Sequence, residues 1–590
     1  MKSFLDNLST RRSGREPPPL PIAIKTKDLG FDRRAQSPAS TVASARTSTD
    51  EKMAKNHHHG LGILDGKDWD DVKGLDWEEK QSWKAPTLTE ISLLSPRSLR
   101  SPKAGWVLRR LRSVFSAVWP KAKPNAQAEP LRKTAYLDGI RGFAAFLVYW
   151  QHHGLWAHFP LQTQLIENVF GFEGQYAFAA FPGVRLLFNG GHFAVATFFV
   201  ISGYVLSTKP LSLIHAGEQA KLADNLSSQL FRRWLRLYIP LIATTFLYML
   251  TWHAFGGLWI GGIKKQGNFR DELWWWYCEL KNFSFMFNSG GEPWLSYNFH
   301  LWSIPVEMKG SIVVYTALLA FSRCTTKARL WCTLGLMFYF MYIADGWYCT
   351  LFVTGMFLAD LDLLAAKNAL PRVMARLSPY KDFIYYHLLV IALYLGGIPT
   401  PSTNFADLQR SRGWYYLSFL KPQAAFDYKW FYLFIAATFL VAATPRIPWL
   451  RRFFETRFCQ YLGRVSYALY LVHGPILWTL GDRLYTAVGW VGSNGLEQFT
   501  ALSWWVNRFP LPMQGPLGME VAFLLPHVIL LPVTFWVAEG VTRWIDEPAV
   551  RFAQSLMKRT MPVVATENGG GGGLGAAPAM QVGMGKKLDA

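Results

Sequence analysis

Four ionisable residues stand in the first apolar stretch of this sequence, "LDGIRGFAAFLVYWQHH", residues 137 to 153: Asp138, Arg141, His152 and His153. Each is costly to place in hydrocarbon, so their presence suggests a functional site in the interior of a helical bundle. Arginine suits phosphate because its planar fork donates several hydrogen bonds, and histidine suits acid-base chemistry because it titrates near neutral pH. The stretch therefore indicates one group that binds an anion and another that moves a proton.

Helical geometry separates the two histidines of this stretch. Arg141 and His152 are eleven positions apart, so on a helix they differ by about 20° in direction and about 16 Å in height. His153 lies about another 100° round the helix, whereas Asp138 is close enough to Arg141 to pair with it or orient it. The spacing thus favours His152 as the partner of Arg141. The alternative is that Arg141 reaches the lipid headgroups and His152 only hydrogen-bonds inside a bundle.

The composition of the whole chain describes the elements that must carry these residues. Of the 590 residues 51% are hydrophobic and 16% aromatic, while 17% are charged, as in a polytopic membrane protein. The net charge of +21 comes from Lys and Arg in the N-terminal part and in short loops. This pattern favours membrane topology over nucleic-acid binding. The five scattered cysteines form neither a disulfide framework nor a metal motif.

Apolar runs long enough to cross a bilayer predict an all-α integral membrane protein with about ten transmembrane helices. The runs begin near Tyr136, His192, Leu237, Trp302, Ala328, Trp347, Phe383, Trp430, Val465 and Glu520. Basic residues gather in every second loop, as at Arg323 to Arg329 and at Arg446 to Arg457. An even number of spans with both termini in the cytosol satisfies the positive-inside rule.

Two terminal segments lack the apolar content of a packed core. Residues 1 to 130 are basic and rich in Ser and Pro, which predicts a disordered cytosolic tail, and residues 560 to 590 form a flexible Gly-rich tail. The triplet His57 to His59 in the first tail has no assigned role. The long loops opposite the basic ones are rich in Trp, Tyr and Phe; an interfacial aromatic belt is favoured there over a sugar-stacking surface.

The stretch "YLDGIRGFAAFLVYWQHH" resembles the first helix of the membrane acyltransferase type 3 family, whose motif is an Arg and a His separated by ten residues. Arg141 and His152 match that motif. The resemblance covers residues 134 to 555 and continues, in the family's order, through "HFAVATFFVISGYVLS", "LFRRWLRLYIP", "HLWSIPVEMKGS", "YLGRVSYALYLVHGPIL" and "RWIDEPAVRFAQ". "PVEMKGS" lacks the second acidic residue of the bacterial pattern and looks like the fungal branch.

The resemblance implies an O-acyltransferase that moves an acyl group, commonly acetyl, from cytosolic acyl-coenzyme A to a hydroxyl on a carbohydrate, lipid or secondary metabolite. The partners implied are the lipid bilayer, the acyl-coenzyme A co-substrate and a small-molecule or glycan acceptor, without nucleic acid. Such a protein would reside in the plasma membrane or an endomembrane. No metal is required and no cofactor stays bound.

Within that hypothesis His152 is the general base on the acceptor hydroxyl, with a transient acyl-histidine as the variant. Arg141 orients the donor, Asp138 fixes Arg141, and Glu307 sets polarity or positions the acceptor. Glu307 follows a Pro within an apolar run, where an unpaired carboxylate is costly, so it should pair with a cation or a polar site. A purely structural pair with an arginine is the alternative.

The remaining candidates are assigned to binding. Arg232, Arg233 and Arg236 are candidates for the phosphates of coenzyme A, with Arg236 expected to point inward; positive-inside anchoring is their alternative. Acceptor contacts are assigned to Ser202, Tyr204, His300, Tyr470 and His473. For "SGY", residues 202 to 204, helix packing is favoured over ligand contact. Tyr470 and His473 lie three apart on one face, where a satisfied core histidine is slightly favoured.

Two other functional classes compete with the enzyme. A transporter would use the same intramembrane charges as a proton or solute pathway, but the sequence lacks the paired halves that internal repeats leave. A receptor or scaffold would keep the fold without the chemistry, and retention of both Arg141 and His152 disfavours it.

Overall fold

The structure, a computed structural model, describes residues 131–159, 163–255, 265–287, 293–490 and 503–560. These residues form helices and turns, with no strand among them, which confirms the predicted all-α class. The predicted N-terminal tail lies outside the described residues, and so does the C-terminal tail beyond Thr560, where the last helix ends.

Twenty α-helices form the described part of the chain. In the first half they are α3 (Ala135–Ala157), α4 (Thr163–Glu167), α5 (Leu186–Asn189), α6 (Gly191–Ala216), α7 (Gln219–Phe255), α8 (Phe269–Ser284), α9 (Ser303–Phe321), α10 (Thr326–Phe338), α11 (Trp347–Ala366) and α12 (Arg372–Leu377). In the second half they are α13 (Lys381–Leu395), α14 (Phe405–Arg410), α15 (Tyr415–Ser418), α16 (Lys429–Ala443), α17 (Pro448–Phe454), α18 (Arg457–Ile476), α19 (Asp482–Ala487), α21 (Val521–Leu524), α22 (His527–Val541) and α23 (Glu547–Thr560).

Short 3-10 and π segments join or interrupt these helices. The 3-10 segments are η4 (Phe172–Gly174), η5 (Phe178–Ala180), η6 (Ser296–Trp302), η8 (Ser378–Tyr380) and η9 (Thr444–Arg446). The π-helical segments are η7 (Tyr339–Ile343), η10 (Leu477–Gly481) and η11 (Thr542–Asp546).

The prediction of ten membrane spans is supported only in part. Each predicted apolar run coincides with a helix, yet in the described residues five helices are long and apolar enough to cross a membrane, or six if one bent pair counts as one span. Helices α13 and α16 have 15 residues each, short of the roughly 20 that a bilayer requires. Helices α3 and α18 are longer but carry Arg, His and Gln.

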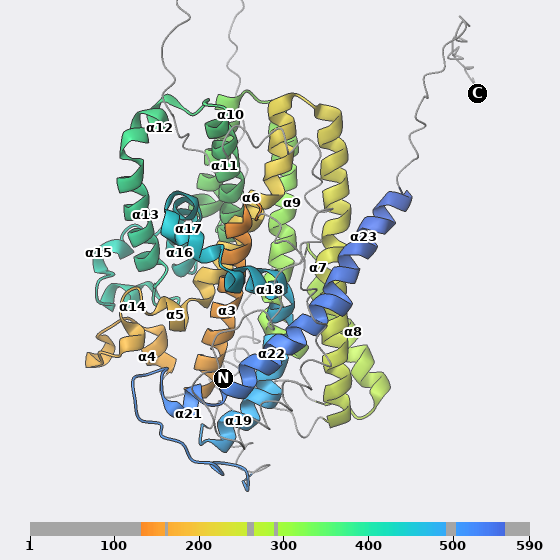
Figure 1. Cartoon of the computed structure of the whole chain (residues 1–590), viewed down its shortest axis with the longest axis vertical. Helices are drawn as coiled ribbons and strands as arrows, with labels where there is room; N and C mark the ends of the chain where they lie inside the picture. Colours follow the sequence, from red (N-terminus) through yellow and green to blue (C-terminus); the bar gives the residue numbers. More distant parts are fainter. Residues whose placement is uncertain (1–130, 160–162, 256–264, 288–292, 491–502, 561–590) are drawn as a thin grey trace, which may run out of the picture. The chain divides into compact units, whose positions relative to one another are not determined.

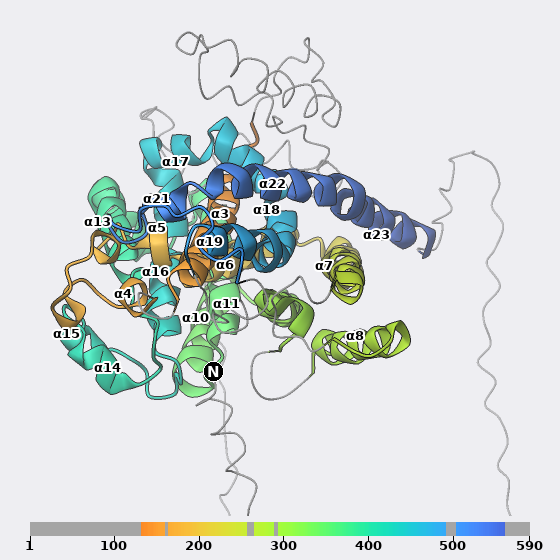
Figure 2. The same ribbon diagram turned by 90° about the horizontal axis from the view of Figure 1, so that it is seen from below.

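Helix α3 lies in the middle of the fold, where it packs against α18 and α6 (Figures 1 and 2). Glycines permit the close approach of α3 and α18: a Cβ on Gly142 would lie 2.2 Å from the backbone nitrogen of Gly463. A Cβ on Gly463 would in turn lie 2.5 Å from the carbonyl oxygen of Asp138. Small residues at such a contact bring two backbones together, so the two helices hold each other in one register.

A second close crossing joins α6 to α11. A Cβ on Gly203 would lie 2.0 Å from the carbonyl oxygen of Phe352, and one on Gly355 would lie 2.1 Å from that of Val200. The favoured reading of "SGY" as a packing site therefore holds for Gly203.

The last helices run differently from the rest. Figure 1 shows α7, α9, α11 and α13 running along the long axis of the view, with α22 and α23 crossing it obliquely. Helix α23 continues from α22 through η11 and packs against α7. This crossing brings the "RWIDEPAVRFAQ" stretch to the same region of the fold as α3, α7 and α18.

Candidate active site

A cavity of about 510 Å³ opens among α3, α6, α7, α9, α18 and α23, within the size range of small-molecule sites. Charged residues line much of it: Arg132, Asp138, Arg141, Arg233, Arg236, Glu307, Arg464, Asp546, Glu547 and Arg551. Apolar side chains such as Val195, Phe198 and Ile304 complete the wall. The cavity thus combines an arginine-rich lining with an apolar part, which suits a ligand that has an anionic end and a less polar arm.

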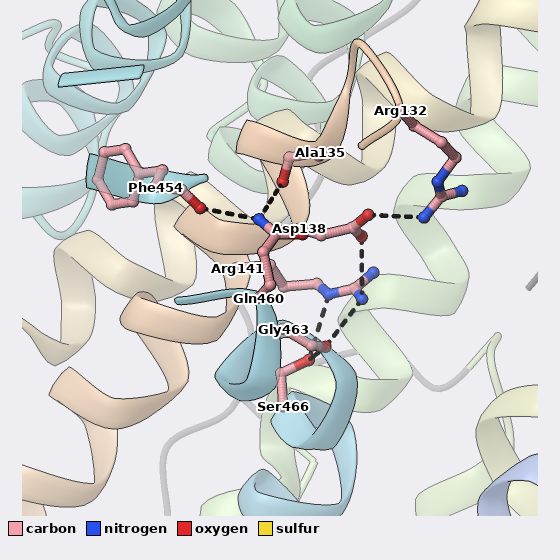
Figure 3. Close-up of polar contacts among 8 residues, drawn as sticks. All are labelled: Arg132, Ala135, Asp138, Arg141, Phe454, Gln460, Gly463 and Ser466. Atoms are coloured by element: carbon pink, nitrogen blue, oxygen red, sulfur yellow. Dashed lines mark hydrogen bonds and ion pairs between the residues drawn. The ribbon is translucent and has the colours of Figure 1, made fainter. Parts of the chain in front are cut away.

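Arg141 is held in the cavity wall by α18 and by its own helix, as Figure 3 shows. Its Nε donates to Ser466 Oγ at 3.2 Å, and its Nη2 donates to the carbonyl of Gly463 at 3.1 Å. The same Nη2 lies 3.2 Å from Asp138 Oδ1. Because 36% of the Arg141 side chain stays exposed, the guanidinium is oriented and still accessible to a ligand.

Asp138 forms ion pairs with two arginines, Arg132 and Arg141. Its second oxygen accepts a hydrogen bond from Arg132 Nη2 at 2.8 Å (Figure 3). The predicted pairing of Asp138 with Arg141 is present, and Arg132 adds a cation that sequence reasoning did not single out. Gln460 on α18 joins the start of α3 to the end of α17, because its Nε2 donates to the carbonyls of Ala135 and Phe454, each at 2.8 Å.

Glu307 on α9 is paired, as expected for a carboxylate in an apolar run. It forms an ion pair with Arg233 and accepts a hydrogen bond from Ser202 Oγ at 2.6 Å. Arg233 Nε also donates to Ser311 Oγ at 2.9 Å. All of these residues except Ser311 line the cavity, so α6, α7 and α9 meet at one polar junction on its wall.

Two predicted binding residues point elsewhere. Arg232 is buried and its Nε donates to the carbonyl of Ser228 at 3.1 Å, whereas Arg233 and Arg236 line the cavity. Tyr204 is buried and donates to Asp362 at 3.0 Å, and neither Tyr204 nor Arg232 belongs to the cavity lining. The basic group at 232 to 236 is therefore divided, because one turn of α7 presents its residues to different sides.

Three histidines from separate parts of the chain gather near the other end of α3. The ring centroid of His152 lies 3.8 Å from that of His300, in η6, and 5.2 Å from that of His473, on α18. His300 and His473 stack nearly parallel at 4.9 Å. His473 Nδ1 lies 2.8 Å from the carbonyl of Tyr470; because a carbonyl only accepts, Nδ1 carries the proton and Nε2 keeps its lone pair.

His153 occupies the other side of α3. It is fully buried, its Nδ1 lies 2.9 Å from the hydroxyl of Tyr485, and its ring packs 4.2 Å from that of Tyr149. His152 and Arg141, in contrast, both contact residues of α18. The predicted difference in direction between the two histidines is present in the structure.

Tyr470 connects the cavity to the histidines. It lines the cavity, its ring lies 5.7 Å from that of His473, and its hydroxyl donates to the carbonyl of His300. Ser303, also in the lining, contacts the same hydroxyl at 2.7 Å. The arginine-lined cavity and the three histidines are therefore adjacent parts of one region.

The lining includes residues for which the sequence analysis proposed no role, among them Arg464 and Arg551. Arg464 forms ion pairs with Glu539 on α22 and with Glu547 on α23, the latter at 3.3 Å. Arg464 stands in "YLGRVSYALYLVHGPIL" and Arg551 in "RWIDEPAVRFAQ". These motifs were recognised, but their arginines were not separated from the other basic residues of the chain.

Comparison with known proteins shows the family of this chain. A family model described as an acyltransferase domain, that of acyltransferase 3, matches residues 134–536. The chain is 32% identical to O-acetyltransferase PaAT-1 of Phomopsis amygdali over 464 residues, which cover 72% of this chain and 88% of that protein.

Two other fungal relatives are more distant. Acyltransferase clz18 of Cochliobolus lunatus is 23% identical over 74% of this chain and 98% of its own length. Acyltransferase R4 of a Phoma species is 24% identical over 63% of this chain and 88% of its own length. No solved structure matches the chain.

The family model extends over more than half of the chain, and its match begins at Thr134, one residue before α3, the helix that carries Arg141 and His152. The transporter alternative is not favoured by this match. The chain belongs to the acyltransferase 3 family of membrane proteins.

Proposed function

We propose that this protein is an O-acyltransferase that transfers an acyl group, most simply acetyl, from acyl-coenzyme A to a hydroxyl of a carbohydrate, lipid or secondary metabolite. The observation that carries the proposal is the adjacency of the arginine-lined cavity and the three histidines. The O-acetyltransferase named among the relatives supports acetyl as the group transferred.

The arginines of the cavity would bind the phosphates of coenzyme A. Arg141 is held by Asp138, Ser466 and Gly463, so it presents an ordered guanidinium, and Arg233 and Arg236 line the same cavity from α7. A donor whose phosphates lie at Arg141 must span about 16 Å along α3 to bring its thioester to His152. Coenzyme A carries a long arm between phosphate and thioester, which is the shape this distance requires.

The proposed reaction requires that His152 be a neutral imidazole whose lone pair can accept a proton. His152 takes the proton of the acceptor hydroxyl as the oxygen attacks the thioester carbonyl. The carbon–sulfur bond then breaks, and the thiolate leaves with a proton returned by His152. The products are an ester and free coenzyme A. In the variant mechanism His152 itself attacks the thioester carbonyl, the carbon–sulfur bond breaks and the thiolate leaves. The acceptor oxygen then attacks the acyl-imidazole, the acyl–nitrogen bond breaks, and the hydroxyl proton passes to the released imidazole.

Other polar residues would position the reactants. Asp138 holds Arg141, and Glu307 holds Arg233 while it accepts from Ser202. His300 and His473 lie beside His152, and Tyr470 contacts both of them, so we assign these three residues to contact with the acceptor near the reacting hydroxyl.

The direct test is thioester consumption. Purified protein in detergent or nanodiscs is given acetyl-coenzyme A together with a metabolite extract, and free thiol and new acetyl esters are measured. The proposal requires thiol release that depends on the extract, with ester of one acetyl mass formed in parallel. Thiol release equal to that of a His152→Ala protein of the same folded amount would contradict it.

For topology we propose ten membrane crossings with both termini in the cytosol, in which shorter helices such as α13 and α16 cross as parts of the bundle. The basic loops at Arg323 to Arg329 and Arg446 to Arg457 support this orientation. Protease added to sealed, right-side-out membranes should then spare both tails, and cleavage of either tail would refute the orientation.

A further inference from the structure

Three imidazoles in one place suggest a second property of this site. One nitrogen from each of His152, His300 and His473 can be chosen so that all three lie within 4.8 Å of one another. We propose that these histidines form a binding site for a divalent transition-metal ion such as Zn²⁺.

The donor atoms have the required chemistry. His300 Nδ1 and His473 Nε2 are buried and have no hydrogen-bond partner among the described residues. An unpartnered buried nitrogen is costly, and a neutral imidazole lone pair is a preferred ligand of Zn²⁺. Among the His, Cys, Asp and Glu side chains of the described residues, these three histidines lie close enough together to share one metal ion.

The surroundings also fit a metal ligand set. The Nδ1–H of His473 donates to the backbone carbonyl of Tyr470, and such a hydrogen bond orients a metal-ligating histidine and directs its other nitrogen toward the ion. Three nitrogens leave one tetrahedral position for water or a hydroxyl. Nitrogens on one tetrahedral zinc lie about 3.4 Å apart, so the rings must turn toward a common centre on binding.

Cation binding has a defined consequence for the proposed function, on which this step rests. The lone pair that His152 gives to the cation is not available to accept the proton of the acceptor. The metal-free protein should therefore be the active form, and Zn²⁺ should inhibit it reversibly.

The first experiment measures binding without turnover. The protein is the full chain with His57→Ala, His58→Ala and His59→Ala, which removes three consecutive histidines as a competing candidate for Co²⁺ binding, and it is purified without a histidine tag. Co²⁺ is titrated in and followed by its visible absorption, then displaced with Zn²⁺. We expect about one equivalent with a tetrahedral spectrum.

Substitution of two ligands should abolish this site. Removing a residue that only hydrogen-bonds to a metal ligand lowers metal affinity by about 10–100-fold. His300→Gln and His473→Gln each remove a ligand itself, so each should weaken binding at least that much. The matched control is His387→Gln, an exposed histidine on α13. Thermal unfolding in detergent identifies any variant that fails to fold. Undiminished binding in a folded His300→Gln, His473→Gln double variant, or no binding by the parent, would overturn the proposal.

Activity separates the metal site from the base assignment. If both are right, chelator leaves the rate unchanged or raises it, and Zn²⁺ lowers the rate of the parent protein. If binding is seen but chelator abolishes turnover and Zn²⁺ restores it, the site stands and the assignment of His152 as a free base fails. If binding is absent while turnover depends on His152, the metal site fails and the proposed function stands.

Discussion

The two ends of α3 differ in how their polar groups are satisfied. Near Arg141, cations and carboxylates are matched: Arg132 and Arg141 contact Asp138, Arg233 contacts Glu307, and Arg464 contacts Glu547. Near His152, the nitrogens Nδ1 of His300 and Nε2 of His473 lack partners among the described residues.

The contrast separates binding from chemistry. An arginine that must receive phosphate gains from neighbours that fix its geometry, because less side-chain entropy is then lost on binding. A base must keep a lone pair for a proton, so neighbours that occupied it would prevent the reaction. Helix α3 therefore has an ordered cationic end and, about 16 Å away, an end at which His152 lies beside the unpartnered nitrogens of His300 and His473.

The largest expected effect is a loss of turnover on substitution of His152, at the histidine end of α3. His152→Ala removes the proposed base and should lower turnover by about two to four orders of magnitude. His153→Ala, on the other side of α3, should reduce turnover far less once the amount of folded protein is equalised. Initial rates at saturating donor give the measurement. A larger loss at His153 would show that the wrong histidine has been assigned.

The next effect concerns the arginine end. Arg141→Lys replaces a fork held at three points by a single ammonium, so the KM for acyl-coenzyme A should rise about 10-fold to 100-fold, the value of one or two charged hydrogen bonds. Turnover at saturating donor should change less. Arg452→Lys, an exposed arginine on α17 outside the cavity, is the control. An unchanged KM in Arg141→Lys would exclude this arginine from donor binding.

The smallest expected effects distinguish Tyr204, which lies outside the cavity lining, from Ser202, which lies within it. Tyr204→Phe removes a buried hydrogen bond to Asp362, and should cost about 1–2 kcal/mol of stability while KM values stay the same. Ser202→Ala, two residues away in the cavity wall, should instead alter the KM for donor or acceptor through Glu307. Thermal unfolding and steady-state rates together distinguish the two outcomes. A changed KM in Tyr204→Phe would extend the site toward α11.

Much of the site was predictable from local spacing. The eleven-residue interval between Arg141 and His152, the direction of His153 and the pairing of Asp138 depend on the period of one helix, and the structure shows each of them. The need of Glu307 for a polar partner followed from its apolar surroundings, and Arg233 and Ser202 meet it. The order of the six motifs was sufficient for the family, as the match over residues 134–536 confirms.

The sequence by itself determined the all-α class, the family and the polar stripe of α3, because these follow from composition, order and helical period. The tertiary structure alone decided that His300 and His473 meet His152, and that Arg464 and Arg551 share a cavity with Arg141. Each of these four residues lies more than a hundred positions from the residue of α3 that it joins, so no local period relates the two. The glycine contact of α3 with α18 brings His473 and Arg464 to α3, and the oblique course of α23 brings Arg551 to the same cavity; both are set only by packing.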